Sequence, residues 1–243
     1  MKIDIHTHVL PKIDDGARNI EETFTIIQEA YKAGFKHIFC TSHFIENEYE
    51  TSIEDREAII QMIQKKLNED NIDITLHCGS EIFITPNLDE LFRKGIVGTL
   101  ANTRYLLMEL PLNTEINYLE NMLYKLASMD LIPIIAHPER YTMVQKKPEV
   151  CKKMLDLGAL LQGNYGSLIG NYGIHAKKTL LKLLKRNQIH FLGSDVHRAG
   201  SIYLQIQKIL DKLEKKIGKE KVREITEENP EKILNNEDFY KEL

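Results

Sequence analysis

The chain has 243 residues, of which 42% are hydrophobic and 28% charged, and this ordinary composition excludes a disordered or fibrous protein. Its formal net charge of −4 argues against a protein whose main role is to bind nucleic acid, because such surfaces are normally basic. We see neither a signal peptide nor an apolar run long enough to insert into a membrane. The three cysteines have no C-x-x-C pairing and suit a reducing compartment, so we expect a cytoplasmic protein.

Short runs typical of β-strands alternate with segments of helical periodicity. The expected strands are residues 2–6, 37–41, 74–78, 105–109, 132–136, 159–162 and 189–193. The expected helices are residues 20–32, 53–68, 88–94, 116–129, 148–157, 175–185, 201–217 and 220–228.

This alternation predicts an α/β fold with a parallel sheet and helices outside it. Seven units without a linker favour a single domain over residues 1–243, built as a (β/α)7 barrel similar to a TIM barrel, with the last helices, about 201–235, packed on it. An open doubly wound sheet is the alternative. The lysine-rich segment 208–224 is expected to be the solvated face of the last helices, and a binding patch is the alternative.

Imidazole, carboxylate and amide side chains stand at the ends of the expected strands. They are His6, His8, His43, Glu81, Glu109, His137, Asn164, Asp195 and His197. Because the carboxyl ends of parallel strands meet at one edge, where ligands bind, these side chains should lie together. Histidine nitrogen with carboxylate oxygen, in the absence of cysteine, is a ligand set for catalytic Zn²⁺, Mn²⁺ or Fe²⁺. With the adjacent Asp14 and Asp15, these groups exceed what one four-coordinate ion needs, which predicts two or three ions.

Two arginines follow these candidate ligands. Arg140 ends the motif AHPER, and its forked guanidinium can bind a phosphate; a salt bridge to Glu139 or another rim carboxylate is the alternative. Arg198, in SDVHR, is a second candidate. No cysteine is followed by arginine six positions later, and neither a G-x-x-x-x-G-K-[ST] loop nor a G-x-S-x-G elbow is present. A phosphatase with this sequence would therefore depend on metal.

The motifs DIHTH, TSH, GSEI, MELP, AHPER and SDVH, in this order and spacing, resemble the polymerase and histidinol phosphatase (PHP) superfamily. They are most similar to the bacterial PHP-type tyrosine phosphatases that act with capsule and exopolysaccharide tyrosine kinases. The resemblance spans about residues 2–235. It implies a distorted seven-stranded barrel with a trinuclear centre, commonly of manganese, although Fe²⁺ and Zn²⁺ accept the same ligands.

The resemblance also implies a role for each candidate residue. His6, His8, Glu81 and Asp195 would hold one ion; Glu81, Glu109 and His137 a second; His43, His197 and either Asp14 or Asp15 a third. Arg140 corresponds to the arginine that binds the substrate phosphate, and we also expect a catalytic role for Asp15. The relatives have a further arginine and prolines after SD-x-H, whereas the loop here reads SDVHRAGSIYL. We expect Arg198 and Asn164 to contact the substrate.

Together these features predict a metal-dependent phosphoric monoester hydrolase in which a water activated by the ions attacks phosphorus. The resemblance implies a protein-tyrosine phosphatase whose partner is the phosphorylated tail of a membrane tyrosine kinase. One alternative is a small-molecule phosphatase, for example one acting on histidinol phosphate. Another is a non-catalytic, metal-stabilised module that binds a protein.

Overall fold

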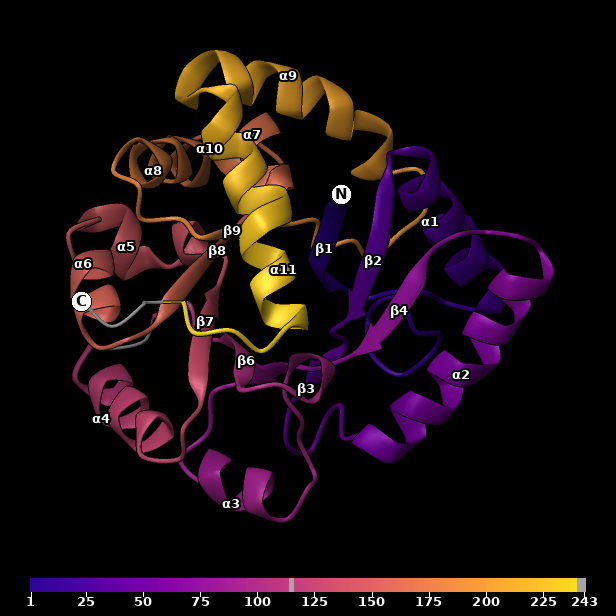
Figure 1. Ribbon diagram of the computed structural model, residues 1–243. Coiled ribbons are helices and arrows are strands. Elements are labelled where there is room, and N and C mark those ends of the chain that lie inside the picture. The colour runs from indigo at the N-terminus through magenta and orange to yellow at the C-terminus, as the bar shows by residue number, and fades with distance from the viewer. Residues whose placement is uncertain (114–115, 240–243) are drawn as a thin grey trace.

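The computed structural model describes residues 1–113 and 116–239 (Figure 1). Its strands are β1 (Lys2–Thr7), β2 (Phe35–Cys40), β3 (His43–Phe44), β4 (Thr75–Cys78), β5 (Glu81–Phe83), β6 (Tyr105–Glu109), β7 (Ile132–Ala136), β8 (Leu160–Asn164) and β9 (Phe191–Gly193). Each of these strands pairs in parallel with its neighbours, so the predicted α/β class with parallel strands is confirmed. The last residues of the predicted domain, 240–243, lie outside the described residues, as do residues 114–115.

Helices flank most of the strands in Figure 1. They are α1 (Ile20–Lys32), α2 (Ile53–Glu69), α3 (Leu88–Arg93), α4 (Ile116–Ala127), α5 (Thr142–Lys146), α6 (Val150–Asp156), α7 (Tyr165–Ile169), α8 (Gly173–Lys185), α9 (Ile206–Ile217), α10 (Lys219–Arg223) and α11 (Asn229–Leu234). Shorter turns are η1 (Leu100–Asn102), η2 (Pro138–Arg140), η3 (Tyr203–Gln205) and the π-turn η4 (Glu224–Glu228). No helix of the described residues is both long and apolar enough to cross a bilayer.

The helices differ from the predicted ones where proline or a short turn intervenes. The residue before Pro148, Lys147, has ψ 80°, because proline disfavours a helical residue before it, and so α5 ends at Lys146 and α6 begins only at Val150. The predicted helix 201–217 begins at Ile206, after the 3-10 turn η3. The predicted helix 220–228 corresponds to α10 and the π-turn η4, and α11 follows beyond its predicted end.

The strands form two sheets that join at both seams. The orders are β1-β2-β4 and β3-β5-β6-β7-β8-β9. At one seam β2 and β3, and likewise β4 and β5, are successive pieces of interrupted strands, and Glu81 N donates to Thr41 O at 3.0 Å. At the other, Thr7 forms a parallel bridge with Val196, and Asp195 N donates to His6 O at 2.9 Å. The pairings therefore follow chain order through the two sheets and across both seams, and we call this arrangement the ring.

Apolar side chains fill two separate layers. One cluster inside the ring includes Ile3, Ile5, Leu107, Ile134 and Phe191, all fully buried. A larger cluster lies between the strands and the surrounding helices. Successive strand residues point to opposite faces, so a single strand such as β6 supplies both layers.

The C-terminal helices cover the amino ends of the strands. In Figure 1, α10 and α11 lie across the ring, and Ile233 of α11 belongs to the interior cluster. Asn229 Nδ2 donates to the carbonyl of His190, just before β9, at 2.9 Å. This cover leaves the carboxyl ends of the strands as the open end of the ring.

Candidate metal centre

The carboxyl ends of the strands bring the predicted residues together. His6 lies on β1 and His8 just beyond it, while His43 and Glu81 begin β3 and β5. Glu109 is the last residue of β6. His137 follows β7, and Asp195 and His197 follow β9. Three groups drawn from these residues and Asp15 have ligand atoms within 4.8 Å of one another, and none of the three includes a cysteine.

The first group consists of His6, His8, Glu81 and Asp195, all buried. The two histidine Nε2 atoms are 3.2 Å apart. Glu81 Oε2 lies 3.1 Å from Nε2 of His6 and 3.3 Å from that of His8, and Asp195 Oδ1 lies 3.5 and 3.3 Å from the same atoms. Two nitrogens and two carboxylate oxygens thus surround one point.

Two further side chains orient these imidazoles. Nδ1 of His6 lies 2.7 Å from Oε1 of Gln162, and Nδ1 of His8 lies 2.8 Å from Oδ2 of Asp14. A donor role for both Nδ1 atoms directs the Nε2 lone pairs toward the common point, as in most histidine metal ligands. Gln162 was missed from the sequence; its only signal there is a polar residue at the end of an otherwise apolar strand.

A second group consists of His43, Glu81 and Glu109. His137 approaches it, with Nε2 3.0 Å from Glu81 Oε1 and 3.7 Å from Glu109 Oε1. Glu81 Oε2 and Nδ1 of His43 are buried without a hydrogen-bond partner, although they lie 3.2 Å apart. Buried polar atoms normally have a partner, and a nitrogen and a carboxylate oxygen that lack one can serve as ligands to an ion. This donor set therefore fits a divalent cation.

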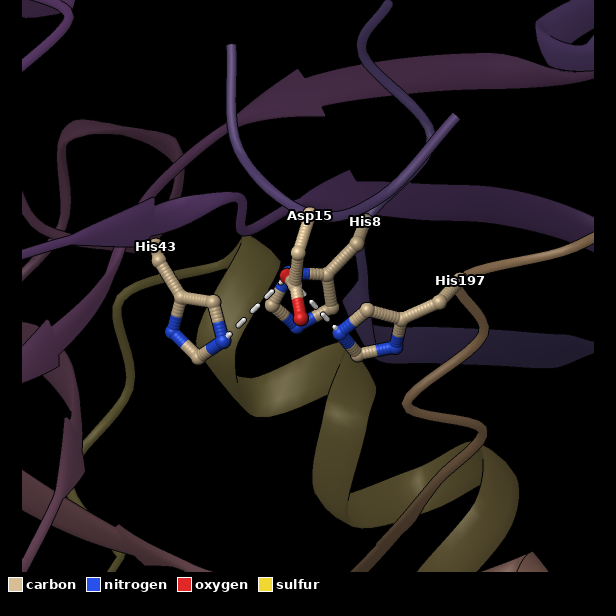
Figure 2. A group of neighbouring side chains, drawn as sticks. All are labelled: His8, Asp15, His43 and His197. Carbon is tan, nitrogen blue, oxygen red and sulfur yellow. Dashed lines mark ion pairs between the residues drawn. The ribbon is translucent and has the colours of Figure 1, made fainter. Parts of the chain in front are cut away.

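Figure 2 shows the third group, His8, Asp15, His43 and His197, with the Asp15 carboxylate between two imidazoles. Asp15 Oδ1 lies 3.3 Å from Nε2 of His197 and 3.7 Å from Nε2 of His43. Asp14, left open as an alternative by the sequence, belongs to none of the three groups. Its carboxylate instead accepts hydrogen bonds from the backbone N–H groups of Gly16 and His43, in addition to contacting His8.

The backbone is strained where two of the candidate ligands leave their strands. His137 has φ 34° and Asp195 has φ 53°, in the left-handed region that side chains other than glycine rarely adopt. Gly16 allows a close approach, because a Cβ there would clash with the backbone of His8. Such strain persists only where surrounding contacts impose it, and it is common at functional sites.

Burial and charge shift the pKa values of the clustered groups. Burial lowers the pKa of His6, but the charges of Glu81 and Asp195 outweigh it and raise that pKa to about 9. Burial would raise the pKa of Glu81, yet the charge of His6 and a hydrogen bond from His137 hold it well below its usual range. Burial and the charge of Glu81 raise the pKa of Glu109 to about 8. Because metal ligands must be deprotonated, an ion would replace protons here.

Arg140 lies at the edge of the cluster, on η2. Its Nη1 donates to Asp195 Oδ2 at 3.1 Å, and its guanidinium carbon lies 4.6 Å from the ring centre of Tyr172. The ion pair expected as an alternative is thus present, with Asp195 and not with Glu139. The Arg140 side chain is 27% exposed, and its other N–H groups remain available to an anion. Tyr172, missed from the sequence, also donates its hydroxyl to Asp195 Oδ2 at 3.2 Å.

Two predicted substrate contacts are engaged elsewhere. Asn164 is fully buried; its Nδ2 donates to Asp195 Oδ2 at 2.7 Å and its Oδ1 accepts from Gln162 Nε2 at 2.8 Å, so it lies behind the cluster. Arg198 donates through Nη1 to the carbonyl oxygens of Asp15, Gly16 and His197. Its guanidinium therefore holds the loop that carries Asp15.

A parallel α/β fold with imidazoles and carboxylates gathered at its strand ends is the arrangement of a metal-dependent hydrolase. The family model for capsular polysaccharide synthesis, CpsB/CapC, matches residues 2–235. The chain belongs to the CpsB/CapC family.

Similar proteins extend over almost the whole chain. The tyrosine-protein phosphatase YwqE of Bacillus subtilis is 31% identical over 240 residues, which cover 99% of this chain and 94% of YwqE. The tyrosine-protein phosphatase CpsB of Streptococcus pneumoniae is 29% identical, over 96% of this chain and 98% of CpsB.

Solved structures extend the likeness to the fold. A structure from work on YwqE and CpsB, described as unique metal-dependent tyrosine phosphatases, matches with a TM-score of 0.92 and 31% identity, over 99% of this chain and 97% of its own. A histidinol phosphate phosphatase from Lactococcus lactis, with a TM-score of 0.57 and 14% identity over 89% of this chain and 94% of its own, shares the fold alone.

Proposed function

We propose that this protein is a metal-dependent protein-tyrosine phosphatase. The observation that carries the proposal is the cluster of His6, His8, Glu81 and Asp195, in which two imidazole nitrogens and two carboxylate oxygens converge on one point. The Nδ1 atoms of the two imidazoles are already within hydrogen-bond distance of Gln162 and Asp14. Metal-dependent tyrosine phosphatase activity, described for the related proteins, agrees with this donor set.

The three groups of side chains support two or three divalent ions, of which we propose Mn²⁺ as the native one. His6, His8, Glu81 and Asp195 would hold the first. Glu81, Glu109 and His137, with His43 nearby, would hold the second. Asp15, His43 and His197 would hold the third, whereas Asp14 supports His8 and is not a ligand in this proposal. When bound, the ions would supply an activated water and offset phosphate charge near neutral pH.

The chain's own groups would bind and orient the substrate. Arg140 can donate to phosphate oxygens while its bond to Asp195 and its contact with Tyr172 hold the guanidinium in place. The phenol of tyrosine has a pKa of about 10, so its anion leaves without a strong general acid. Asp15, 55% exposed at the mouth of the cluster, can accept a proton from an approaching water or hold an ion.

We further propose a location in the cytoplasm and, as partner, a phosphotyrosine segment in the tail of a membrane tyrosine kinase. The three free cysteines support a reducing compartment. Membership of the CpsB/CapC family of capsular polysaccharide synthesis supports a partner that acts in capsular polysaccharide synthesis.

The test is hydrolysis by the purified protein with and without Mn²⁺. We expect turnover of p-nitrophenyl phosphate with Mn²⁺, loss of that turnover on EDTA addition, and a preference for a phosphotyrosine peptide over histidinol phosphate. Full activity after exhaustive chelation would contradict the metal dependence. A preference for histidinol phosphate would contradict the proposed substrate.

A further inference from the structure

A groove on the outer flank of the molecule lies apart from the candidate metal centre, and it shares no residue with it. It encloses about 310 Å³ and is lined by α7, α8, η3 and α9. Helix α7 contacts both α8 and α9, which lie on the same side of the ring in Figure 1. Apolar side chains form its floor, among them Leu181 of α8 and Leu213 of α9, the latter only 2% exposed.

Four lysines line this groove: Lys177 of α8 and Lys208, Lys212 and Lys216 of α9. The three on α9 are spaced four residues apart, so they follow one side of the helix. In the part of the chain that the structure describes, none of the four forms an ion pair, whereas Lys182 on α8 is 3.6 Å from Glu149. The four ammonium groups therefore have no carboxylate within 4 Å among the described residues, although Asp211 and Glu214 lie on the same helix α9.

The part of the chain that contains the groove also carries an excess of positive charge. Residues 144–222 contain 16 Lys and Arg against 6 Asp and Glu, whereas the rest of the chain contains 16 against 30. The modest net charge of −4 thus combines a basic stretch of sequence, residues 144–222, with an acidic remainder. A field of this kind steers oppositely charged partners toward one face.

The groove also lies close to Arg140, the residue proposed to bind the substrate phosphate. Ile169 lines the groove, and Tyr172, three residues later, contacts Asp195 and Arg140. Three residues of extended chain span at most about 10 Å. A polypeptide in the groove is therefore within reach of the candidate catalytic end of the ring.

We propose that the groove docks an acidic segment of the phosphoprotein substrate, placing an apolar side chain on the floor and carboxylates against the four lysines. This rests on the proposed phosphatase function and adds a determinant of substrate choice to it. A flat anionic membrane would not reach a floor as recessed as Leu213, and the lining residues include no aromatic on which a nucleic-acid base could stack. The segment expected to be a solvated face is, on this view, in part a binding surface.

The experiment compares two double charge reversals. Lys208→Glu with Lys212→Glu alters the groove, and Lys32→Glu with Lys65→Glu makes the same charge change at exposed helical lysines elsewhere. The substrates are a phosphotyrosine peptide flanked by glutamates and a leucine, the same peptide with glutamine for glutamate, and p-nitrophenyl phosphate.

We expect the groove variant to raise KM for the acidic peptide about tenfold at low salt, because two attractions become repulsions. Its kcat, its turnover of p-nitrophenyl phosphate and its KM for the glutamine peptide should stay as in the wild type. Leu181→Gln should raise KM for both leucine-containing peptides. The control reversal should change none of these values.

An unchanged KM in the groove variant would overturn the proposal, as would an equal rise in both reversals, which would indicate a general charge effect. Loss of binding to phosphatidylserine vesicles with unchanged peptide kinetics would assign the flank to a membrane surface instead. If the wild type does not hydrolyse p-nitrophenyl phosphate, the proposed function fails by itself. Direct binding of the fluorescently labelled acidic peptide, weaker in the groove variant, would still support the groove.

Discussion

At their carboxyl ends the strands carry imidazoles and carboxylates that are buried against one another, whereas at their amino ends the same strands are covered by apolar contacts with α11. Ile233 enters the interior cluster at the covered end. At the open end, Glu81 and His6 are equally buried but polar. The covered end is therefore stabilised by removing apolar surface from water. At the open end, burying ionisable groups costs free energy, which a bound cation would offset.

Histidines at the two ends show the difference directly. The charges of neighbouring carboxylates outweigh burial at His6 and raise its pKa to about 9. Burial dominates at His190, next to the covered end, and lowers its pKa to about 4. Neighbouring carboxylates thus favour the protonated form of His6 in the absence of metal, whereas burial favours the neutral form of His190.

The largest expected effect is at Glu81, which is shared by two of the three groups. Glu81→Gln should lower turnover of p-nitrophenyl phosphate with Mn²⁺ by about a thousandfold, since loss of a shared ligand removes several kcal/mol of charge stabilisation. Turnover and bound metal are measured together, and circular dichroism checks the fold. The exposed Glu57→Gln serves as the control, and wild-type turnover in Glu81→Gln would remove this residue from the centre.

At the covered end, Ile233→Ala should lower the free energy of unfolding by about 2–5 kcal/mol, because it leaves a cavity in the interior cluster. Activity per folded molecule should be unaffected, since this end carries none of the candidate ligands. Urea denaturation gives the stability change. Met62→Ala, at a side chain that is 57% exposed, should have almost no effect. An equal loss in both variants would contradict the role of α11 as a cover.

Gln162 tests whether the orienting side chains matter at the open end. Gln162→Leu removes the acceptor for Nδ1 of His6 and should weaken Mn²⁺ affinity about 10- to 100-fold, with little change at saturating metal. A titration of activity against Mn²⁺ measures this. Gln61→Leu, at an exposed position of α2, is the control. Unaltered affinity would show that His6 needs no such partner.

The smallest expected effect concerns pH and the covered end. The folded pKa of His190, about 4, lies below its unfolded value of about 6.5, so the unfolded chain binds the proton first as pH falls. The contribution of His190 to the free energy of unfolding is therefore present above about pH 6.5 and is lost as the pH falls from about 6.5 to 4. Between pH 7 and pH 5 this loss is about 2 kcal/mol.

The check is His190→Gln, which should flatten this dependence even if it is less stable throughout. Both proteins are unfolded by urea in EDTA, so that contributions of the open end cancel in the comparison. Parallel pH profiles for the two proteins would contradict the burial effect at His190.

Much of the architecture could be predicted from the sequence. The alternation of strand and helix periods yields the parallel α/β class. The residues predicted at the strand ends, apart from His137 and Asn164, are gathered by the structure into three groups together with Asp15, and their binding of metal stays a prediction. Both follow from local rules, since carboxyl ends of parallel strands must share an edge. The interruptions after Cys40 and Cys78, which separate β2 from β3 and β4 from β5, were not predicted, because the pattern of apolar residues does not indicate where the hydrogen bonding between strands is interrupted.

Only the tertiary structure placed Asp15 among the grouped ligand atoms and Asp14 outside them, and gave Arg198 and Asn164 hydrogen-bond partners within the protein. Adjacent aspartates have the same chemistry, and their roles depend on a loop whose return past His8 requires Gly16. Gln162 and Tyr172 acquire their positions from residues far along the chain, His6 and Asp195. The sequence by itself determined which chemical groups the strand ends carry, because strand periodicity is local. The fold decided which partner each group meets, because those contacts join segments that only packing brings together.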